Sequence, residues 1–91
     1  MPYIKPADRE KFEGFNHALT SETDIETPGE LNYLITRLIL AYKDNRPPGY
    51  QTINDIIGAL EGAKLEFYRR SAAPYEDEKI EENGDVYLSY E

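Results

Sequence analysis

Two runs of apolar residues with helical spacing constrain the fold of this chain more than any other feature. The first run lies between a Thr27-Pro28 pair and a Pro47-Pro48-Gly49 turn. Its apolar positions are Leu31, Leu34, Ile35, Leu38, Ile39 and Tyr42. Spacing of three and four residues places them in one stripe along a helix. We therefore predict a helix over residues 28–44, which ends before the prolines because proline excludes the helical conformation just before it.

The start of this helix carries the spacing of a capping box. Thr27 is followed three residues later by Glu30, and Pro28 occupies the first helical position. We expect the Thr27 hydroxyl to accept a hydrogen bond from the amide of Glu30. We expect the Glu30 carboxylate to return to the amide of Thr27.

The second run begins near Thr52, which has Asp55 three residues later. Its apolar positions again share one face: Ile53, Ile56, Ile57, Leu60, Ala63 and Phe67. We predict a second helix over residues 52–72, broken or kinked at Pro74. The two runs together predict a helical hairpin.

The remaining segments are shorter and more polar. Apolar spacing predicts a short N-terminal helix over residues 6–19, followed by a polar loop over 20–26. Residues 73–91 form an acidic C-terminal extension with one basic and seven acidic side chains. At its end, residues 85–91 have apolar side chains at alternate positions, which predicts either a short strand or an irregular tail. We predict an all-α fold and a single domain over residues 1–91.

Composition excludes several classes of protein. The 91 residues include no cysteine, so disulfides and thiolate metal sites are excluded. No stretch approaches the roughly 18 apolar residues of a membrane span, and the chain starts without a signal peptide. We expect a soluble protein of the cytoplasm. The net charge of −8 makes direct nucleic-acid binding unfavourable.

A basic and aromatic cluster near the end of the second helix is the best candidate ligand site. It consists of Lys64, Tyr68, Arg69 and Arg70. Arginine and tyrosine together suit a phosphate and a base, which predicts an anionic, nucleotide-like ligand. In the alternative interpretation, these cations favour the helix C-terminus and pair with Glu61, Glu66 or the acidic tail.

Four other residues indicate self-association. Tyr33 and Leu40 lie outside the main stripe of the first helix, and Gly58 and Gly62 form a ridge of small residues on the second. A chain this short buries little surface. We predict a homo-oligomer, with a dimer favoured, in which Gly58 and Gly62 allow another helix to approach closely.

The sequence offers no catalytic residue and no metal site. An all-α nucleotide hydrolase needs acids at positions i and i+3 on facing helices to hold magnesium. The first helix has only Glu30 before Asp44, and Glu61 and Glu66 on the second are five residues apart. We therefore predict a protein that is not an enzyme and that needs no cofactor.

Three stretches resemble a known family. They are Gly29 to Ile39, with the sequence GELNYLITRLI, Ile53 to Arg70, with the sequence INDIIGALEGAKLEFYRR, and the segment from Ala73 to Tyr87. The family is an uncharacterised one of short acidic proteins from tailed phages and bacterial genomes. The resemblance implies a phage accessory or anti-defence protein and assigns no residue a role.

Three functional hypotheses follow, and the missing pair of acids argues against one of them, a divergent hydrolase. The other two are binding functions. In the first, a non-catalytic oligomer sequesters an anionic nucleotide at Lys64, Tyr68, Arg69 and Arg70. In the second, an acidic inhibitor binds a host protein, for instance by occupying a groove that accepts nucleic acid. The sequence barely discriminates between them.

Overall fold

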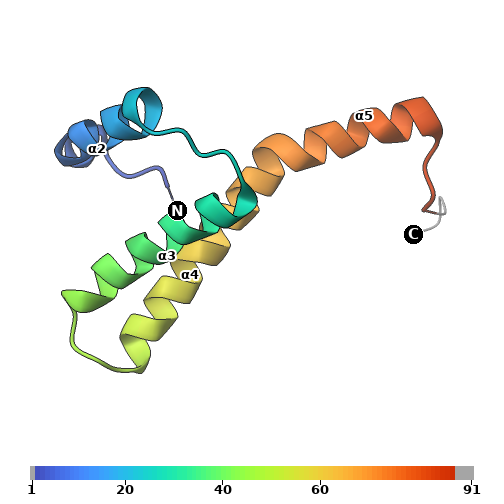
Figure 1. Ribbon diagram of the computed structural model, residues 1–91. Coiled ribbons are helices and arrows are strands. Elements are labelled where there is room, and N and C mark those ends of the chain that lie inside the picture. Colours follow the sequence, from blue (N-terminus) through green and yellow to red (C-terminus); the bar gives the residue numbers. More distant parts are fainter. Residues whose placement is uncertain (1, 88–91) are drawn as a thin grey trace.

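The computed structural model describes residues 2–87, which form helices without any strand (Figure 1). The N-terminal part consists of α1 (Pro6–Arg9), η1 (Glu10–Phe12), α2 (Glu13–His17) and η2 (Ala18–Glu22). The hairpin and the C-terminal part consist of α3 (Pro28–Asp44), α4 (Tyr50–Phe67), η3 (Tyr68–Ala72) and α5 (Ala73–Asn83). The prediction of an all-α fold is confirmed.

The start of α3 follows the predicted capping box with one difference. The amide of Glu30 donates to Thr27 Oγ1 at 3.1 Å, as expected. The Glu30 carboxylate, however, accepts from the amide of Glu26 at 2.7 Å and not from that of Thr27. Thr27 is extended (φ −130°, ψ 156°), and this conformation brings the amide of Glu26 within reach of the Glu30 side chain.

The start of α4 differs from the prediction. The helix begins at Tyr50, and its N-cap is Gly49, whose φ of 155° favours glycine. The first helical hydrogen bond runs from the amide of Ile53 to the carbonyl of Gly49 at 3.3 Å. The Thr52 hydroxyl instead donates to the carbonyl of Pro47 at 2.9 Å. Thr52 thus fixes the loop to the helix and does not cap it.

Of the two outcomes predicted at Pro74, a break is wrong, because α4, η3 and α5 form one uninterrupted helix from Tyr50 to Asn83. The long helix does change direction between α4 and α5 (Figure 1). Proline lacks the amide that an α-helix needs at that position. The helical turn just before Pro74 contains one extra residue. There the amide of Ala73 donates to the carbonyl of Tyr68, five residues back, and not to the carbonyl four residues back. This π-type turn rearranges the hydrogen bonds around Pro74, so the helix continues. It ends at Gly84, whose φ is +91° and whose amide donates to the carbonyl of Ile80 at 2.9 Å.

The structure also differs from the prediction near both ends of the chain. The N-terminal segment is helical from Pro6 to Glu22, so the loop that was predicted over 20–26 begins three residues later than predicted, at Thr23. At the other end, residues 85–87 are not a strand. The rest of the alternating segment, 88–91, lies outside the described residues.

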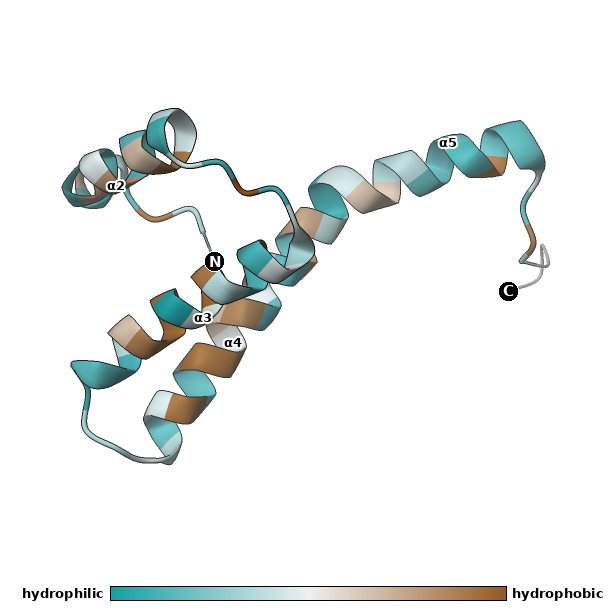
Figure 2. Cartoon of the chain, viewed as in Figure 1, coloured by the Kyte–Doolittle hydropathy of each residue, from teal (hydrophilic) through white to brown (hydrophobic). Residues whose placement is uncertain are grey.

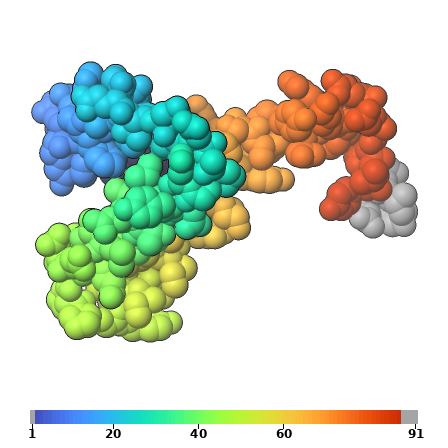
Figure 3. All heavy atoms as spheres, in the orientation of Figure 1, coloured from blue at the N-terminus to red at the C-terminus, as the bar shows by residue number. Residues whose placement is uncertain are grey.

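Packing within one chain is sparse. None of the described residues is buried. The apolar bands of α3 and α4 lie on the hairpin, whereas α5 is mostly hydrophilic (Figure 2). The long helix carries α5 away from the hairpin, so the molecule is extended, with dimensions of 50 × 36 × 30 Å (Figure 3). A single copy therefore leaves most of its apolar side chains in contact with water.

Candidate functional site

The four residues of the basic and aromatic cluster lie on different surfaces. Lys64 lines a groove between α3 and α4, and Tyr68 lines a groove along α5. Arg69 lines a small hollow where Pro2 approaches α4. Arg70 follows directly in η3. Successive helical residues point in different directions, about 100° apart, so proximity in sequence does not bring these four side chains together into one pocket.

Two of these cations pair with acids of the same helix. Lys64 Nζ lies 3.6 Å from Glu61 Oε1, and Arg69 Nε donates to Glu66 Oε1 at 2.7 Å. The hydrogen bond from Arg69 lowers the pKa of Glu66, and the same bond raises the pKa of Arg69. The alternative interpretation of the cluster, in which cations pair with Glu61 and Glu66, agrees with these contacts.

The predicted interface residues lie in two kinds of surroundings. Tyr33 is 62% exposed and Leu40 is 40% exposed, so both are accessible to a partner. A Cβ atom added at Gly58 would meet nothing within 4 Å. Gly62 is half-buried and lines the hollow that contains Pro2. Thus it is the N-terminal arm of the same chain that approaches Gly62, and the predicted role of Gly58 stays a prediction.

The groove between α3 and α4 has a mostly apolar lining. It is lined by the predicted stripes of both helices, with Asp55 and Lys64 as its charged members. The apolar lining comes from Leu31, Ile35, Leu38, Ile39, Tyr42, Ile56, Ala59, Leu60, Ala63 and Phe67. With the exception of Ala59, these residues belong to the two apolar stripes that the sequence predicted for the hairpin. In one copy of the chain, they line a groove that is open to solvent.

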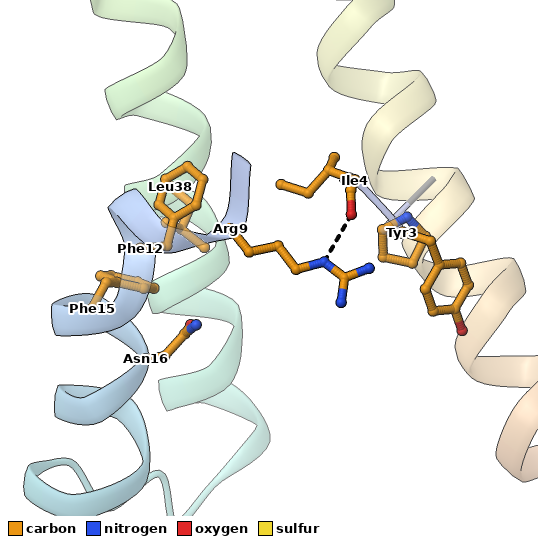
Figure 4. A pocket seen from close by; sticks show the side chains of 8 residues that line it. Tyr3, Ile4, Arg9, Phe12, Phe15, Asn16 and Leu38 are labelled. Atoms are coloured by element: carbon orange, nitrogen blue, oxygen red, sulfur yellow. Dashed lines mark hydrogen bonds between the residues drawn. The ribbon is translucent and has the colours of Figure 1, made fainter. Parts of the chain in front are cut away.

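A second hollow, which the sequence did not predict, lies between the N-terminal segment and α3. Phe12 and Phe15 lie beside Leu38 there, and the arm with Tyr3 and Ile4 lies on the other side of the hollow (Figure 4). The Arg9 guanidinium donates to the carbonyl of Ile4 at 2.8 Å. This bond fixes the arm to α1. The helical spacing of the two phenylalanines signalled an apolar face but not the element that would meet it.

The surface along α5 combines acids with exposed apolar groups. The helix carries five acids and one cation: Glu76, Asp77, Glu78, Glu81, Glu82 and Lys79. Lys79 pairs with Glu82 at 3.0 Å and lies over the ring of Tyr75 at 5.4 Å. Beside these acids, Ile80, Val86 and Tyr87 line the α5 groove. The sequence predicted only an acidic C-terminal extension here and did not predict the groove.

One comparison with known proteins identifies the family. A family model described as Domain of unknown function (DUF6899) matches residues 1–86. The chain belongs to this family. No curated protein and no solved structure is similar enough to match.

Membership of DUF6899 confirms the resemblance to an uncharacterised family and brings no assigned residues. The geometry adds two observations on chemistry. Within residues 2–87, no three histidine, aspartate or glutamate side chains lie close enough together to hold a metal ion. No helix in that range is both long enough and apolar enough to cross a membrane.

Proposed function

We propose that this DUF6899 chain is a non-catalytic binding protein whose projecting acidic helix, α5, docks on a basic surface of a protein partner. One observation carries the proposal: α5 extends away from the hairpin into solvent and carries five acids against a single lysine (Figure 1). A projecting helix can enter a groove or cover a surface patch that a flat face cannot reach. Its charge favours partners of the opposite sign and speeds their encounter.

The groove beside the acids supports a protein partner more than a small ligand. Tyr75 is 56% exposed, and Val86 and Tyr87 are also exposed at the far end of the helix. Exposed aromatic side chains are typical anchors of protein interfaces, where burial of their rings provides affinity. The acids around them would then set orientation and specificity. A nucleotide, which is itself anionic, would be repelled from this surface.

The resemblance to short acidic phage and bacterial proteins supports a more specific proposal about the partner of α5. The partner would be a host protein in the cytoplasm, and α5 would occupy a groove that otherwise accepts nucleic acid. Five carboxylates along one helix present negative charge of the kind that a phosphate-binding surface attracts. The protein would then act as an accessory or anti-defence factor. Neither a cofactor nor a catalytic step is part of the proposal.

The test is site-specific photo-cross-linking at Tyr75 in cells that contain the natural partner. A cross-linking amino acid at this position on α5 should capture one protein with a basic surface. The triple variant Glu78→Gln, Glu81→Gln and Glu82→Gln should lose that product because it removes three charges while it keeps the helix. The matched control, Glu61→Gln, removes a charge from α4 and should leave the product unchanged.

Two outcomes would contradict the proposal. If the triple variant still forms the same cross-linked product, the acids of α5 do not select the partner. Calorimetric binding of a linear or cyclic nucleotide, abolished by Arg69→Ala with Arg70→Ala, would favour the nucleotide hypothesis instead. The double variant should keep its helicity, since exposed ion pairs contribute only about 0–1 kcal/mol each.

A further inference from the structure

A continuous stripe of exposed side chains runs along the whole of α4. Six residues recur there at alternating spacings of three and four, which is the pattern of a helix seam that packs against another helix. They are Tyr50, Ile53, Ile57, Leu60, Lys64 and Phe67, named here the α4 seam. Its five apolar members are 39% to 76% exposed, the two extremes being Leu60 and Tyr50.

The other faces of α4 already have neighbours within the chain. Thr52 is half-buried against the loop at Pro47, and Ile56 is half-buried in the hairpin groove beside α3. Gly62, Leu65 and Arg69 line the hollow that holds Pro2. At 100° per residue these three lie on nearly the opposite side of α4 from the seam. Leu60, Lys64 and Phe67 of the seam also line the edge of the hairpin groove. Within residues 2–87, the N-terminal arm and α3 nevertheless leave all six seam side chains exposed.

We propose that the α4 seam binds the α4 seam of a second copy of this chain, in antiparallel orientation. The seam is symmetric about its own midpoint, between Ile57 and Leu60. When two copies run in opposite directions about a two-fold axis at that point, Ile57 of one lies opposite Leu60 of the other. Tyr50 likewise meets Phe67, and Ile53 meets Lys64. An isologous interface of this kind uses every pair twice.

Lys64 determines the orientation. In a parallel pairing each seam residue meets itself, so two Lys64 ammonium groups would face each other in an apolar interface, which is costly. In the antiparallel pairing the aliphatic stem of Lys64 lies against Ile53 of the second copy. Its ammonium group stays at the edge of the interface, where Glu61 of its own helix is 3.6 Å away.

The surface area of the chain supports a second copy as the occupant. The accessible surface is 8303 Å², whereas a compact monomer of 10.5 kDa exposes about 5,400 Å². The radius of gyration is 17.7 Å, compared with about 12 Å for a compact chain of this length. The excess of about 2,900 Å² is on the scale of what each subunit of an obligate homodimer buries, roughly 1,000–2,500 Å². The chain thus exposes an excess of surface of the size expected for one subunit of a dimer.

The seam lies on α4 and the proposed partner surface lies on α5, so each proposal can fail without the other. The first test is sedimentation equilibrium at micromolar concentration. The wild-type protein should sediment at twice its chain mass of 10.5 kDa. Ile57→Glu, which brings a charge into the centre of the seam, should sediment as a single chain. Asn54→Glu places the same charge on α4 outside the seam and should remain a dimer.

A second variant keeps the test decisive if Ile57→Glu unfolds. Lys64→Leu removes the only charge from the seam and should lower the dimer dissociation constant at least tenfold. Wild-type protein that sediments at 10.5 kDa would overturn the proposal. A Lys64→Leu variant whose dissociation constant is unchanged would overturn it as well.

Cysteine cross-linking tests the orientation, because the natural chain contains no cysteine. A mixture of Tyr50→Cys and Phe67→Cys chains should form a disulfide between the two variants under mild oxidation. Neither variant alone should cross-link to itself. Cross-linking of each variant alone would show a parallel pairing, and a dimer without any cross-link in the mixture would place the interface elsewhere. Both results would contradict the antiparallel seam.

Discussion

Replacement of Pro74 by alanine should stabilise the C-terminal half of the long helix. Pro74 cannot donate the amide hydrogen bond of its position, and the π-type turn at Tyr68–Ala72 rearranges the helix around it. Alanine restores one backbone hydrogen bond, worth about 1 kcal/mol. The upper limit is the full difference between proline and alanine in a helix interior, about 3 kcal/mol. The gain in local stability should fall between these values.

Native-state hydrogen exchange measures this gain directly, because the amides of α5 report the local opening of that helix. A stabilisation of about 1–3 kcal/mol slows exchange roughly 5- to 150-fold. The matched control is Pro28→Ala. Pro28 sits in the first turn of α3, where no amide donor is needed, so this change should leave exchange in α5 unaltered.

Unchanged or faster exchange in α5 of the Pro74→Ala variant would refute this reasoning. It would mean that the π-type turn is favoured by the side chains of residues 68–72 and not imposed by the proline that follows them. The control variant separates this result from a general effect of losing a proline, which acts through the unfolded chain.

Three further changes test individual contacts. Thr27→Ala should lower the free energy of unfolding by about 1 kcal/mol in chemical denaturation, and Thr27→Ser should retain it; equal midpoints for all three proteins would contradict the cap. Gly62→Leu should overfill the hollow beside Pro2 and cost about 1–3 kcal/mol, whereas an unchanged Tm would show that Gly62 faces solvent. The hydrogen bond from Arg69 lowers the pKa of Glu66, so the stabilisation is present above the unfolded pKa of about 4.3 and is lost as the pH falls through the lowered value. Glu66→Gln should therefore weaken the dependence of Tm on acidic pH, and an identical pH profile of Tm for the wild type and the variant would contradict this assignment.

The fold class and the first hairpin helix were predictable because local signals dominate there. Thr27, Glu30 and the apolar stripe after them specify where α3 begins and which face is apolar, and these signals act within a few residues. The course of the chain at Pro74 was not predictable in the same way. Proline ends most helices, but a π-type turn just before it can keep the helix intact, and no single residue type in Tyr68–Ala72 announces that turn.

The candidate site shows where sequence reasoning reaches its limit. Lys64 and Tyr68 are four residues apart and were expected to share a face, yet they line different grooves. The helix is regular between the two residues, because the amide of Tyr68 donates to the carbonyls of Lys64 and Leu65, so a shared face did not suffice for a shared groove. The widened turn that begins at Tyr68 changes the direction only of the side chains after it, which include Arg69 and Arg70. The apolar stripes were identified correctly, but periodicity alone does not tell whether a stripe meets the same chain or a second copy. The open groove and the uncovered α4 seam supply that information.

Native mass spectrometry of the protein purified from the cells that produce it tests the central claim most directly, because it counts the copies and detects any retained ligand in one spectrum. If the protein is a dimer that binds a protein partner, the spectrum should show a mass of twice 10.5 kDa. This dimer should be free or in complex with one basic protein, and it should hold no nucleotide. A single 10.5 kDa chain that retains a nucleotide would contradict the account.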